Sequence, residues 1–495
     1  MSEATDKLVG GHVVTIEDFC QVSPNVWELA RDHDPRMQVP ARIFGSRLIV
    51  EAALGDRSVE QLVNVAMLPG IVEYAIAMPD IHQGYGFPIG GVAAFDYDGG
   101  VVSPGGVGYD INCGVRMLAT HLTEGEIAPY LDELATALFH ACPSGVGEKG
   151  GIRLTQRDLD QVLARGAVWA RERGYATDGD LERTESGGCL AEARLEAVPD
   201  RARTRGLPQL GSLGSGNHFL ELDVVERIYE EDAAAAFGLH LGQVVVQIHC
   251  GSRGLGHEVC TQYLRRFQDA PQRYRIAVPD RELVVAPVSS QEGRDYVAAM
   301  AAAANYAFAN RQVLAYAVRS AFERCLAGKV PNWGLRQVYD VAHNIAKVED
   351  HVVDGTRRRL VVHRKGATRA FPAGHPELSN AYGRTGQPVL VPGSMGTASY
   401  VLVGDVSAMD LTFGSSCHGA GRRMSRHEAT RQIRGEDVRS RLRGRGVVVR
   451  AQSMRGLAEE APEAYKDVDV VVDSVVGAGL ARPVARVHPI AVIKG

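Results

Sequence analysis

An acid and a thiol lie three residues apart in the segment GYDINCG, residues 108–114. The preceding residues 103–107 contain a proline and two adjacent glycines, which exclude a helix. Residues 115–120 are apolar and are predicted to form a short buried strand. Asp110 and Cys113 are therefore expected on a tight loop, where a carboxylate and a thiolate make half of a metal site. On this segment alone, Cys113 as a small buried apolar side chain is the commoner alternative.

Three histidines extend this candidate metal site. His218 follows a glycine-serine loop, His249 lies where the predicted strand 244–248 ends, and His343 stands beside an asparagine in DVAHN. Five ligands are more than one tetrahedral ion needs. Two ions that share the thiolate would use all five, which is an arrangement suited to phosphoryl chemistry. Ligand softness favours Zn or Co over Mn, so the ligand types do not choose the metal.

His418 has a different setting, in the segment CHGAGR. A histidine beside glycine N–H groups and Arg422 suits a nucleophile that attacks phosphorus. A sixth metal ligand or a packed histidine is the alternative. The chain contains no K-x-D-G motif, no G-x-x-x-x-G-K-[ST] loop and no dinucleotide fingerprint, which excludes the common nucleotidyl-transfer lysine and the usual nucleotide folds.

The bulk properties favour a large cytoplasmic protein. The net charge is −5, which argues against a protein that binds nucleic acid through its overall charge. The eight cysteines are scattered without a C-x-x-C pair, as is typical of a reducing compartment. The first residues lack the apolar stretch of a signal peptide, and no apolar run approaches the ~20 residues that span a bilayer.

The elements that position these residues are mixed helices and strands. The chain shows no repeat, no linker and no break in composition, which predicts a single domain over 1–495. Residues 77–91, which include Asp80 and His82, contain too many glycines and prolines for a regular element. The segment 174–207 is charged and is predicted to be a surface excursion. Helices are expected at 26–30, 59–67, 124–140, 156–173 and 295–326.

Eight motifs in this order give the chain a resemblance to a known family. They are MPDIHQGYGFPIGG, GYDINCG, GSGNHFLEL, HCGSRG, DVAHN, PGSMGTASY, CHGAGR and the terminal VIKG. Together they closely resemble the RtcB family of RNA-splicing ligases, from about residue 40 to the last residue. The resemblance implies an α+β fold, a large single domain with packed β-sheets and peripheral helices.

The resemblance also implies an activity and its cofactors. The family's enzymes are GTP- and Mn²⁺-dependent and join an RNA 2′,3′-cyclic phosphate or 3′-phosphate end to a 5′-hydroxyl end, in tRNA splicing or RNA repair. By the matched motifs, one Mn²⁺ would be held by Asp110, Cys113 and His218. The second would be held by Cys113, His249 and His343, and His418 would carry GMP as a phosphoramidate.

The family's guanylate pocket maps onto several segments of this chain. Tyr465 resembles the aromatic residue near the guanine, and Lys494 would bind the base edge, so a C-terminal tag is expected to impair activity. Arg253, Lys365 and Arg426 are candidates for the RNA phosphates, and the small protein archease is a candidate partner. The pocket would comprise Asn217, His218, Phe219, Leu220, Glu221, His343, Asn344, Pro392, Gly393, Ser394, Met395, Ser399, His418, Gly419, Ala420, Gly421, Tyr465 and Lys494.

The chain departs from the family pattern at Cys250, where many relatives have serine after the metal histidine. This second thiol is expected beside the metals, and Cys250→Ser is predicted to retain activity. A metal-dependent phosphodiesterase or nuclease that does not use GTP is the main alternative function, because it would use the same Asp/Cys/His cluster. A catalytically silent RNA-binding protein is a third hypothesis, disfavoured by the net negative charge and the complete ligand set.

Overall fold

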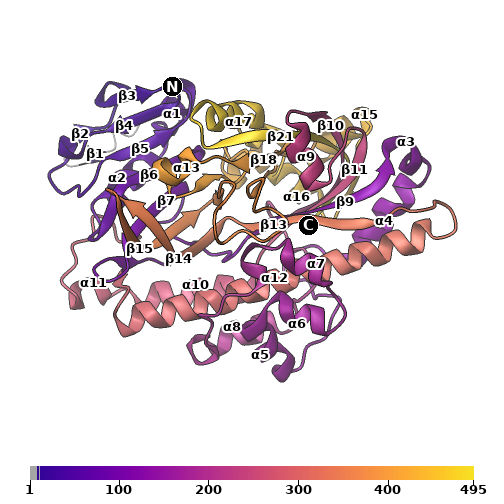
Figure 1. The fold of residues 1–495 in the computed structure, drawn as a ribbon, viewed down its shortest axis with the longest axis horizontal. Helices are drawn as coiled ribbons and strands as arrows, with labels where there is room; N and C mark the ends of the chain where they lie inside the picture. The colour runs from indigo at the N-terminus through magenta and orange to yellow at the C-terminus, as the bar shows by residue number, and fades with distance from the viewer. Residues whose placement is uncertain (1–7, 10–11) are drawn as a thin grey trace.

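Two large β-sheets form the body of the protein in the computed structural model, which describes residues 8–9 and 12–495 (Figure 1). The first sheet places the middle of the chain beside its last strand. Its order is β13 (Leu335–Ala342), β9 (Gly114–Thr123), β11 (Gln243–Cys250), β10 (Phe219–Ile228), β21 (Ala481–Lys494), β18 (Ser399–Gly404) and β17 (Pro388–Val391), with β20 (Val448–Ala451) parallel to β21.

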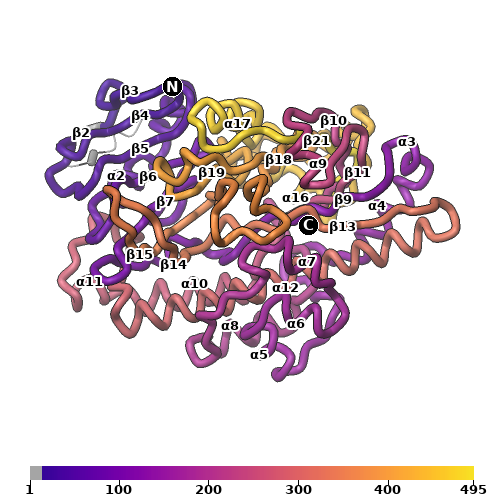
Figure 2. The backbone as a smooth tube through the Cα atoms, viewed as in Figure 1, coloured from indigo at the N-terminus to yellow at the C-terminus, as the bar shows by residue number. Residues whose placement is uncertain are grey.

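The second sheet is formed by the N-terminal part of the chain and one later hairpin. Its order is β14 (Asn344–Val353), β15 (Thr356–Lys365), β7 (Ile89–Asp96), β6 (Ile71–His82), β5 (Ala41–Phe44), β4 (Val26–Leu29) and β3 (Phe19–Ser23). Three strand pairs complete the β-structure: β1 (Leu8–Val9) with β2 (His12–Val13), β8 (Val101–Val102) with β12 (Ala286–Pro287), and β16 (Ala367–Arg369) with β19 (Ser415–Cys417). The tube in Figure 2 follows the chain as it passes between the sheets.

Helices surround the sheets, and the α+β class with packed sheets and peripheral helices is confirmed. They are α1 (Arg47–Ala53), α2 (Ser58–Ala66), α3 (Glu124–Ile127), α4 (Leu131–Ala141), α5 (Gln156–Arg165), α6 (Ala167–Glu172), α7 (Asp178–Glu182), α8 (Asp200–Gly206), α9 (Glu231–Phe237), α10 (Arg253–Arg266), α11 (Ala270–Arg273), α12 (Gln291–Leu326), α13 (Ser407–Thr412), α14 (Arg426–Gln432), α15 (Gly435–Gly444), α16 (Met454–Glu459) and α17 (Val468–Gly477). No helix in the described part of the chain is both long and apolar enough to cross a membrane.

Helix α12 is the longest helix of the described residues and crosses the molecule beneath the sheets in Figure 1, with α5, α6 and α8 below it. It begins at Ser290, whose hydroxyl accepts a hydrogen bond from the N–H of Gly293 at 3.0 Å, a standard N-cap. Its alanine-rich middle favours helix and allows close packing. The largest apolar cluster forms here, between α12 and the short helices α5, α6, α8 and α10.

Several expected elements differ from the structure. Residues 26–30 were expected to be helical but form strand β4, because pairing with β3 and β5 outweighs a short periodic pattern. Residues 77–91, expected to be irregular, contain the end of β6 and the start of β7, so Asp80 and His82 lie on a strand. The expected helix 124–140 is interrupted at residues 128–130, and 156–173 at Gly166.

The segment 174–207 forms α7, α8 and two short 3-10 helices at the outer side of α12 (Figure 1). Parts of it are buried, including Asp180 and Glu185. Asp180 accepts hydrogen bonds from Arg319 of α12 at 2.6 and 3.0 Å. Glu185 accepts a backbone N–H from Ala342 at 2.8 Å, so the segment also supports the end of β13.

Candidate functional site

The register of the first sheet gathers the candidate ligands at one edge. Gly114 of β9 lies opposite both Cys250 of β11 and Ala342 of β13, while Phe219 of β10 lies opposite His249. Four neighbouring strands therefore begin or end at the same edge, and the residues beside their ends are brought together. The residues so placed are Asp110, Cys113, His218, His249 and His343.

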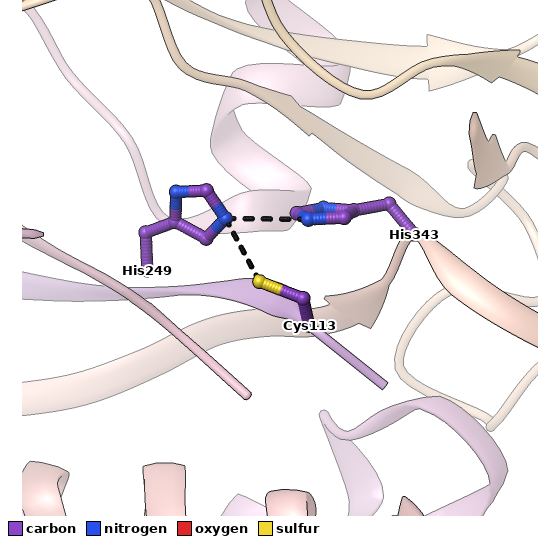
Figure 3. A group of neighbouring side chains, drawn as sticks. All are labelled: Cys113, His249 and His343. Atoms are coloured by element: carbon purple, nitrogen blue, oxygen red, sulfur yellow. Dashed lines mark hydrogen bonds between the residues drawn. The ribbon is translucent and has the colours of Figure 1, made fainter. Parts of the chain in front are cut away.

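These side chains form two adjoining groups that share the Cys113 thiol. The first group is Cys113, His249 and His343, in which Nε2 of His249 lies 3.2 Å from the sulfur and 3.2 Å from Nε2 of His343 (Figure 3). The second group adds Asp110 and His218, whose Nε2 lies 2.7 Å from Asp110 Oδ2 and 3.4 Å from the sulfur. The ligand atoms of each group lie within 4.8 Å of one another, a spacing that suits two metal ions bridged by one thiolate.

Protonation favours metal binding by two of the three histidines; burial lowers the pKa of His218, but the neighbouring Cys113 and Asp110 outweigh this and raise it well above its usual value. Burial lowers the pKa of His249 and of His343 well below the usual value, so both rings are neutral and keep a lone pair. Nδ1 of His218 lies 2.9 Å from the Leu213 carbonyl, which fixes its N–H there and leaves Nε2 facing Asp110. Burial raises the pKa of Asp110, but the neighbouring His218 outweighs this and holds it at about 2.

Helix α12 supports the ligand loops from below through polar side chains. The Arg311 guanidinium donates to the carbonyls of Asn112 at 2.6 Å and Cys250 at 2.9 Å, and it pairs with Asp340 at 2.8 Å. Asn310 accepts the Gly211 N–H at 2.7 Å and so holds the loop before His218. Both side chains are fully buried, and their polar contacts explain why they interrupt the apolar face of this helix.

His418 follows strand β19 and lies beside the first ligand group. Its ring centroid is 4.8 Å from that of His343, and its side chain is 12% exposed. Asp80 Oδ2, at the end of β6, accepts a hydrogen bond from the His418 backbone N–H at 3.0 Å and lies 2.5 Å from Nδ1. With its proton held at Nδ1 by this carboxylate, the ring presents an unprotonated Nε2.

A cavity of about 730 Å³ opens beside His418 and contains most of the residues expected to bind guanylate. It is lined by Asn217, Phe219, Glu221, His343, Asn344, Pro392, Gly393, Ser394, Met395, His418, Gly419, Ala420, Gly421, Tyr465 and Lys494. Three other members of that set do not line it. His218 is in the ligand cluster, Leu220 points into the apolar core from the other face of β10, and Ser399 accepts the Gly393 N–H at 3.0 Å.

Comparison with known proteins agrees with this arrangement. The family model described as tRNA-splicing ligase RtcB matches residues 61–495. The tRNA-splicing ligase RtcB of Thermococcus kodakarensis is 57% identical over 469 residues, covering 95% of this chain and 97% of that protein. The RNA-splicing ligase RtcB of Mycobacterium tuberculosis is 53% identical over 438 residues, covering 88% and 100%. The chain belongs to the RtcB family.

The far wall of the cavity in this RtcB-family chain is a charged network around Glu460. This carboxylate is 1% exposed and accepts hydrogen bonds from Arg422 and Arg426 at 3.1 Å each, and from the Tyr465 hydroxyl. Burial lowers the pKa of Lys494, and burial also raises the pKa of Glu221. Both groups keep hydrogen-bonding capacity that a polar ligand in the cavity could satisfy.

The three basic residues expected to contact RNA differ in their surroundings. Lys365 lines the cavity, but its ammonium donates to the carbonyls of Tyr85 at 2.7 Å and Phe87 at 2.9 Å. Burial lowers its pKa to about 7. Arg426 lines the cavity with its side chain 52% exposed, whereas Arg253 does not line it and donates to Ser212 Oγ at 3.2 Å.

Cys250 does not join the ligand cluster, contrary to expectation. Successive side chains of a strand point to opposite faces, so Cys250 turns away where His249 turns toward the ligands. Its sulfur lies 3.0 Å from the Leu213 carbonyl and receives a hydrogen bond from Asn310 at 3.1 Å. The thiol is therefore a buried structural contact of the His218 loop.

Sequence reasoning missed the roles of Asp80 and Glu460. The sequence predicts an irregular loop around Asp80 and gives it no partner, although its carboxylate lies 2.5 Å from Nδ1 of His418. Glu460 had not been considered. Neither residue carries a local signal, because the partners of both lie far along the chain, and only the motif around Asp80 could have drawn attention to it.

Proposed function

We propose that this protein is a GTP- and Mn²⁺-dependent RNA ligase that joins RNA 3′-phosphate or 2′,3′-cyclic phosphate ends to 5′-hydroxyl ends. The observation that carries the proposal is the placement of His418. Its Nδ1 is held by Asp80 at 2.5 Å, and its ring lies 4.8 Å from His343 at the border of a nucleotide-sized cavity. Family membership and the names of the relatives support an RNA substrate.

The five-residue ligand cluster fits two divalent cations. Asp110, Cys113 and His218 would hold one ion, and Cys113, His249 and His343 the other. When bound, such ions would stabilise negative charge on phosphate oxygens and on the leaving group. The imidazoles, the shared thiol and the carboxylate of this cluster are donors to divalent transition metals, and although the donor types alone would suit softer metals, the family resemblance favours Mn²⁺.

The reaction can be written with the residues of this chain. Nε2 of His418 attacks the α-phosphorus of GTP; a P–N bond forms, the bond to the bridging oxygen breaks and pyrophosphate leaves. The Asp80 carboxylate stabilises the positive charge that develops on the ring. An oxygen of the RNA 3′-phosphate then attacks the same phosphorus and the P–N bond breaks, which restores His418 and activates the RNA end.

The 5′-hydroxyl oxygen next attacks the activated RNA phosphorus. The new phosphodiester bond forms as GMP leaves, and the hydroxyl proton passes to solvent. A 2′,3′-cyclic phosphate is first opened by water to the 3′-phosphate. In the cavity, Glu221 and Lys494 would bind the guanine edge and Tyr465 would lie against the base, while Lys365 and Arg426 would approach the RNA phosphates.

Labelling with α-labelled GTP and Mn²⁺ tests the proposal. Wild-type protein is expected to acquire acid-labile, alkali-stable label, and His418→Ala none. The matched control is His427→Ala, an exposed histidine of α14 that does not line the cavity and whose loss should leave labelling intact. Absence of label in the wild type, with or without archease, together with metal-dependent RNA cleavage would instead establish the phosphodiesterase.

The remaining parts of the proposal concern the setting of the enzyme. We place it in the cytoplasm because its cysteines are free and scattered, six of them buried. Its RNA substrates would be tRNA exons or damaged RNA, and archease would act as a stimulating partner. The whole chain 1–495 would act as one ligase domain, since α12 and β21 link distant segments around one cavity.

A further inference from the structure

A small aromatic cluster borders the cavity beside the Asp110 ligand. The rings of Tyr109 and His257 are stacked with centroids 4.9 Å apart and an interplanar angle of 28°. Tyr85 meets Tyr109 edge-on at 6.0 Å, and the carbonyl of Tyr85 is one of the two that anchor the Lys365 ammonium. The position of Tyr109 is thus supported from one face and from one edge.

Tyr109 is nevertheless open to solvent. Its exposed fraction is 37%, and among the exposed large apolar side chains of residues that the structure describes, Tyr109 alone lines the cavity. Burial and the neighbouring Arg205 lower the pKa of His257, so the stacked pair is neutral at pH 7. An uncharged aromatic surface at the mouth of a polar cavity suits a flat, aromatic ligand.

The cavity has an order that relates this surface to the reacting groups. His418 lies next to His343, the Cys113 thiol joins both ligand groups, and Asp110 lies at the other end, directly preceded in the chain by Tyr109. In the reaction proposed above, GMP held on His418 would occupy the first end. The RNA phosphate that attacks it would then approach from the side of Asp110, with the nucleoside that carries it nearest to Tyr109.

We propose that Tyr109, supported by His257, is a stacking platform for the base of the nucleotide that bears the reacting RNA 3′-phosphate. The proposal rests on the ligase function proposed above. Stacking on an aromatic side chain is tolerant of sequence, because every base has a π face. It would hold the unpaired 3′ end in place while its phosphate is activated, and it would explain why an aromatic residue is exposed beside a metal ligand.

The test is a double-mutant cycle in which one change removes the Tyr109 ring from the protein and the other removes the terminal base from the RNA. The rate of GMP transfer to an RNA 3′-phosphate is measured at subsaturating RNA, for wild type and Tyr109→Ala, with a normal or an abasic 3′-terminal nucleotide. Tyr109→Ala is expected to lose about 5- to 150-fold with normal RNA. With abasic RNA the wild type should be slow already, and the same substitution should cost about twofold or less.

Three further variants serve as controls. Tyr109→Phe should retain the wild-type rate, and Tyr109→Leu, which keeps apolar volume, should lose as Tyr109→Ala does. Tyr316→Ala is the matched surface control: Tyr316 is 43% exposed, meets Tyr175 edge-on at 5.1 Å and lies outside the cavity lining. Its rates with both RNAs should equal those of the wild type.

Several results would overturn the platform. Equal losses with normal and abasic RNA would mean that Tyr109 acts by positioning Asp110. No loss with either RNA would mean that the ring binds nothing. Tyr109→Ala could instead slow the joining step, with a loss that disappears only when the terminal nucleotide of the 5′-hydroxyl strand is abasic. That result would assign the Tyr109 surface to the 5′-hydroxyl strand. If wild-type protein transfers no GMP at all, the ligase function itself is wrong, and the platform with it.

Discussion

Replacing Asp80 by asparagine is expected to slow GMP transfer to His418 by about 10- to 150-fold. The Oδ2 atom accepts two hydrogen bonds from His418, from the backbone N–H at 3.0 Å and at Nδ1 at 2.5 Å. The amide oxygen of asparagine can take the position of Oδ2 and accept both, but it carries no negative charge to stabilise the positive charge that develops on the ring. Its NH₂ group would take the place of Oδ1, a buried atom that has no hydrogen-bond partner.

The size of the effect follows from the surroundings of this carboxylate. Asp80 is 0% exposed, so water cannot replace the lost contact. A hydrogen bond to a charged group contributes about 1.5–3 kcal/mol, equivalent to about 10- to 150-fold in rate, and asparagine removes the charge. The amide has nearly the same volume as the carboxylate, so packing against Gly90 and Gly421 is preserved.

The assay is the single-turnover rate of labelling with α-labelled GTP, measured over a range of GTP concentrations. We expect the maximal rate to fall while the half-saturating GTP concentration changes about threefold or less, because Asp80 touches His418 and not the bound nucleotide. His418→Ala, which lacks the attacking nitrogen, gives the background signal of the assay. A labelling rate of Asp80→Asn within about threefold of the wild type would show that the carboxylate does not control the nucleophile.

Three other predictions follow. Burial lowers the pKa of His363 to about 4, so stability is lost as pH falls from 6.5 through 4; between pH 7 and 5 urea unfolding should show a loss of about 2 kcal/mol that is absent in His363→Gln. Cys250→Ser should keep ligation within about twofold, since a hydroxyl can make the same contacts to Leu213 and Asn310; complete loss would implicate the thiol in chemistry. Residues added after buried Gly495 should lower GMP labelling about tenfold or more relative to an N-terminal extension, and equal labelling would argue against a role for Lys494.

The parts of the fold that the sequence predicts well have strong local patterns. Three strands are largely apolar runs next to glycine-rich loops, at 115–120, 219–222 and 244–248. The helix from 295 to 326 is rich in alanine with few helix-breaking residues. Their glycine loops and histidines lie at element ends. That is why the ligand set could be assembled from residue types before any distance was known.

Strand β6 shows where local patterns fail. Pro79 argues against a central strand because it cannot donate a hydrogen bond to a neighbour. In the structure, pairing with β5 stops at Ala77, and the register with β7 shifts between Ala77 and His82. Pro79 therefore lies where the pairing is irregular on both sides of the strand and no backbone N–H is required, and the strand continues to His82.

The links between distant segments could not be predicted from any one motif. Asp80 meets His418 across 338 residues of sequence, and Arg311 meets Asn112 across 199. Such pairs depend on how the two sheets pack, which is set by the whole set of buried contacts. The same reason explains Cys250: its residue type suggested a ligand, but the alternation of strand β11 directs it away from the cluster.

The central place of β21 in the first sheet has a consequence for synthesis of the chain on the ribosome. β10 and β18 flank this strand on its two sides, yet β21 follows all the other strands that the structure describes. Until it emerges, β10 and β18 present open edges that can pair with other chains. Lys494 lies opposite Phe219 and lines the cavity, so the cavity is incomplete until β21 has been made. We expect a nascent chain to need protection from aggregation and to acquire its cavity only after β21 has emerged.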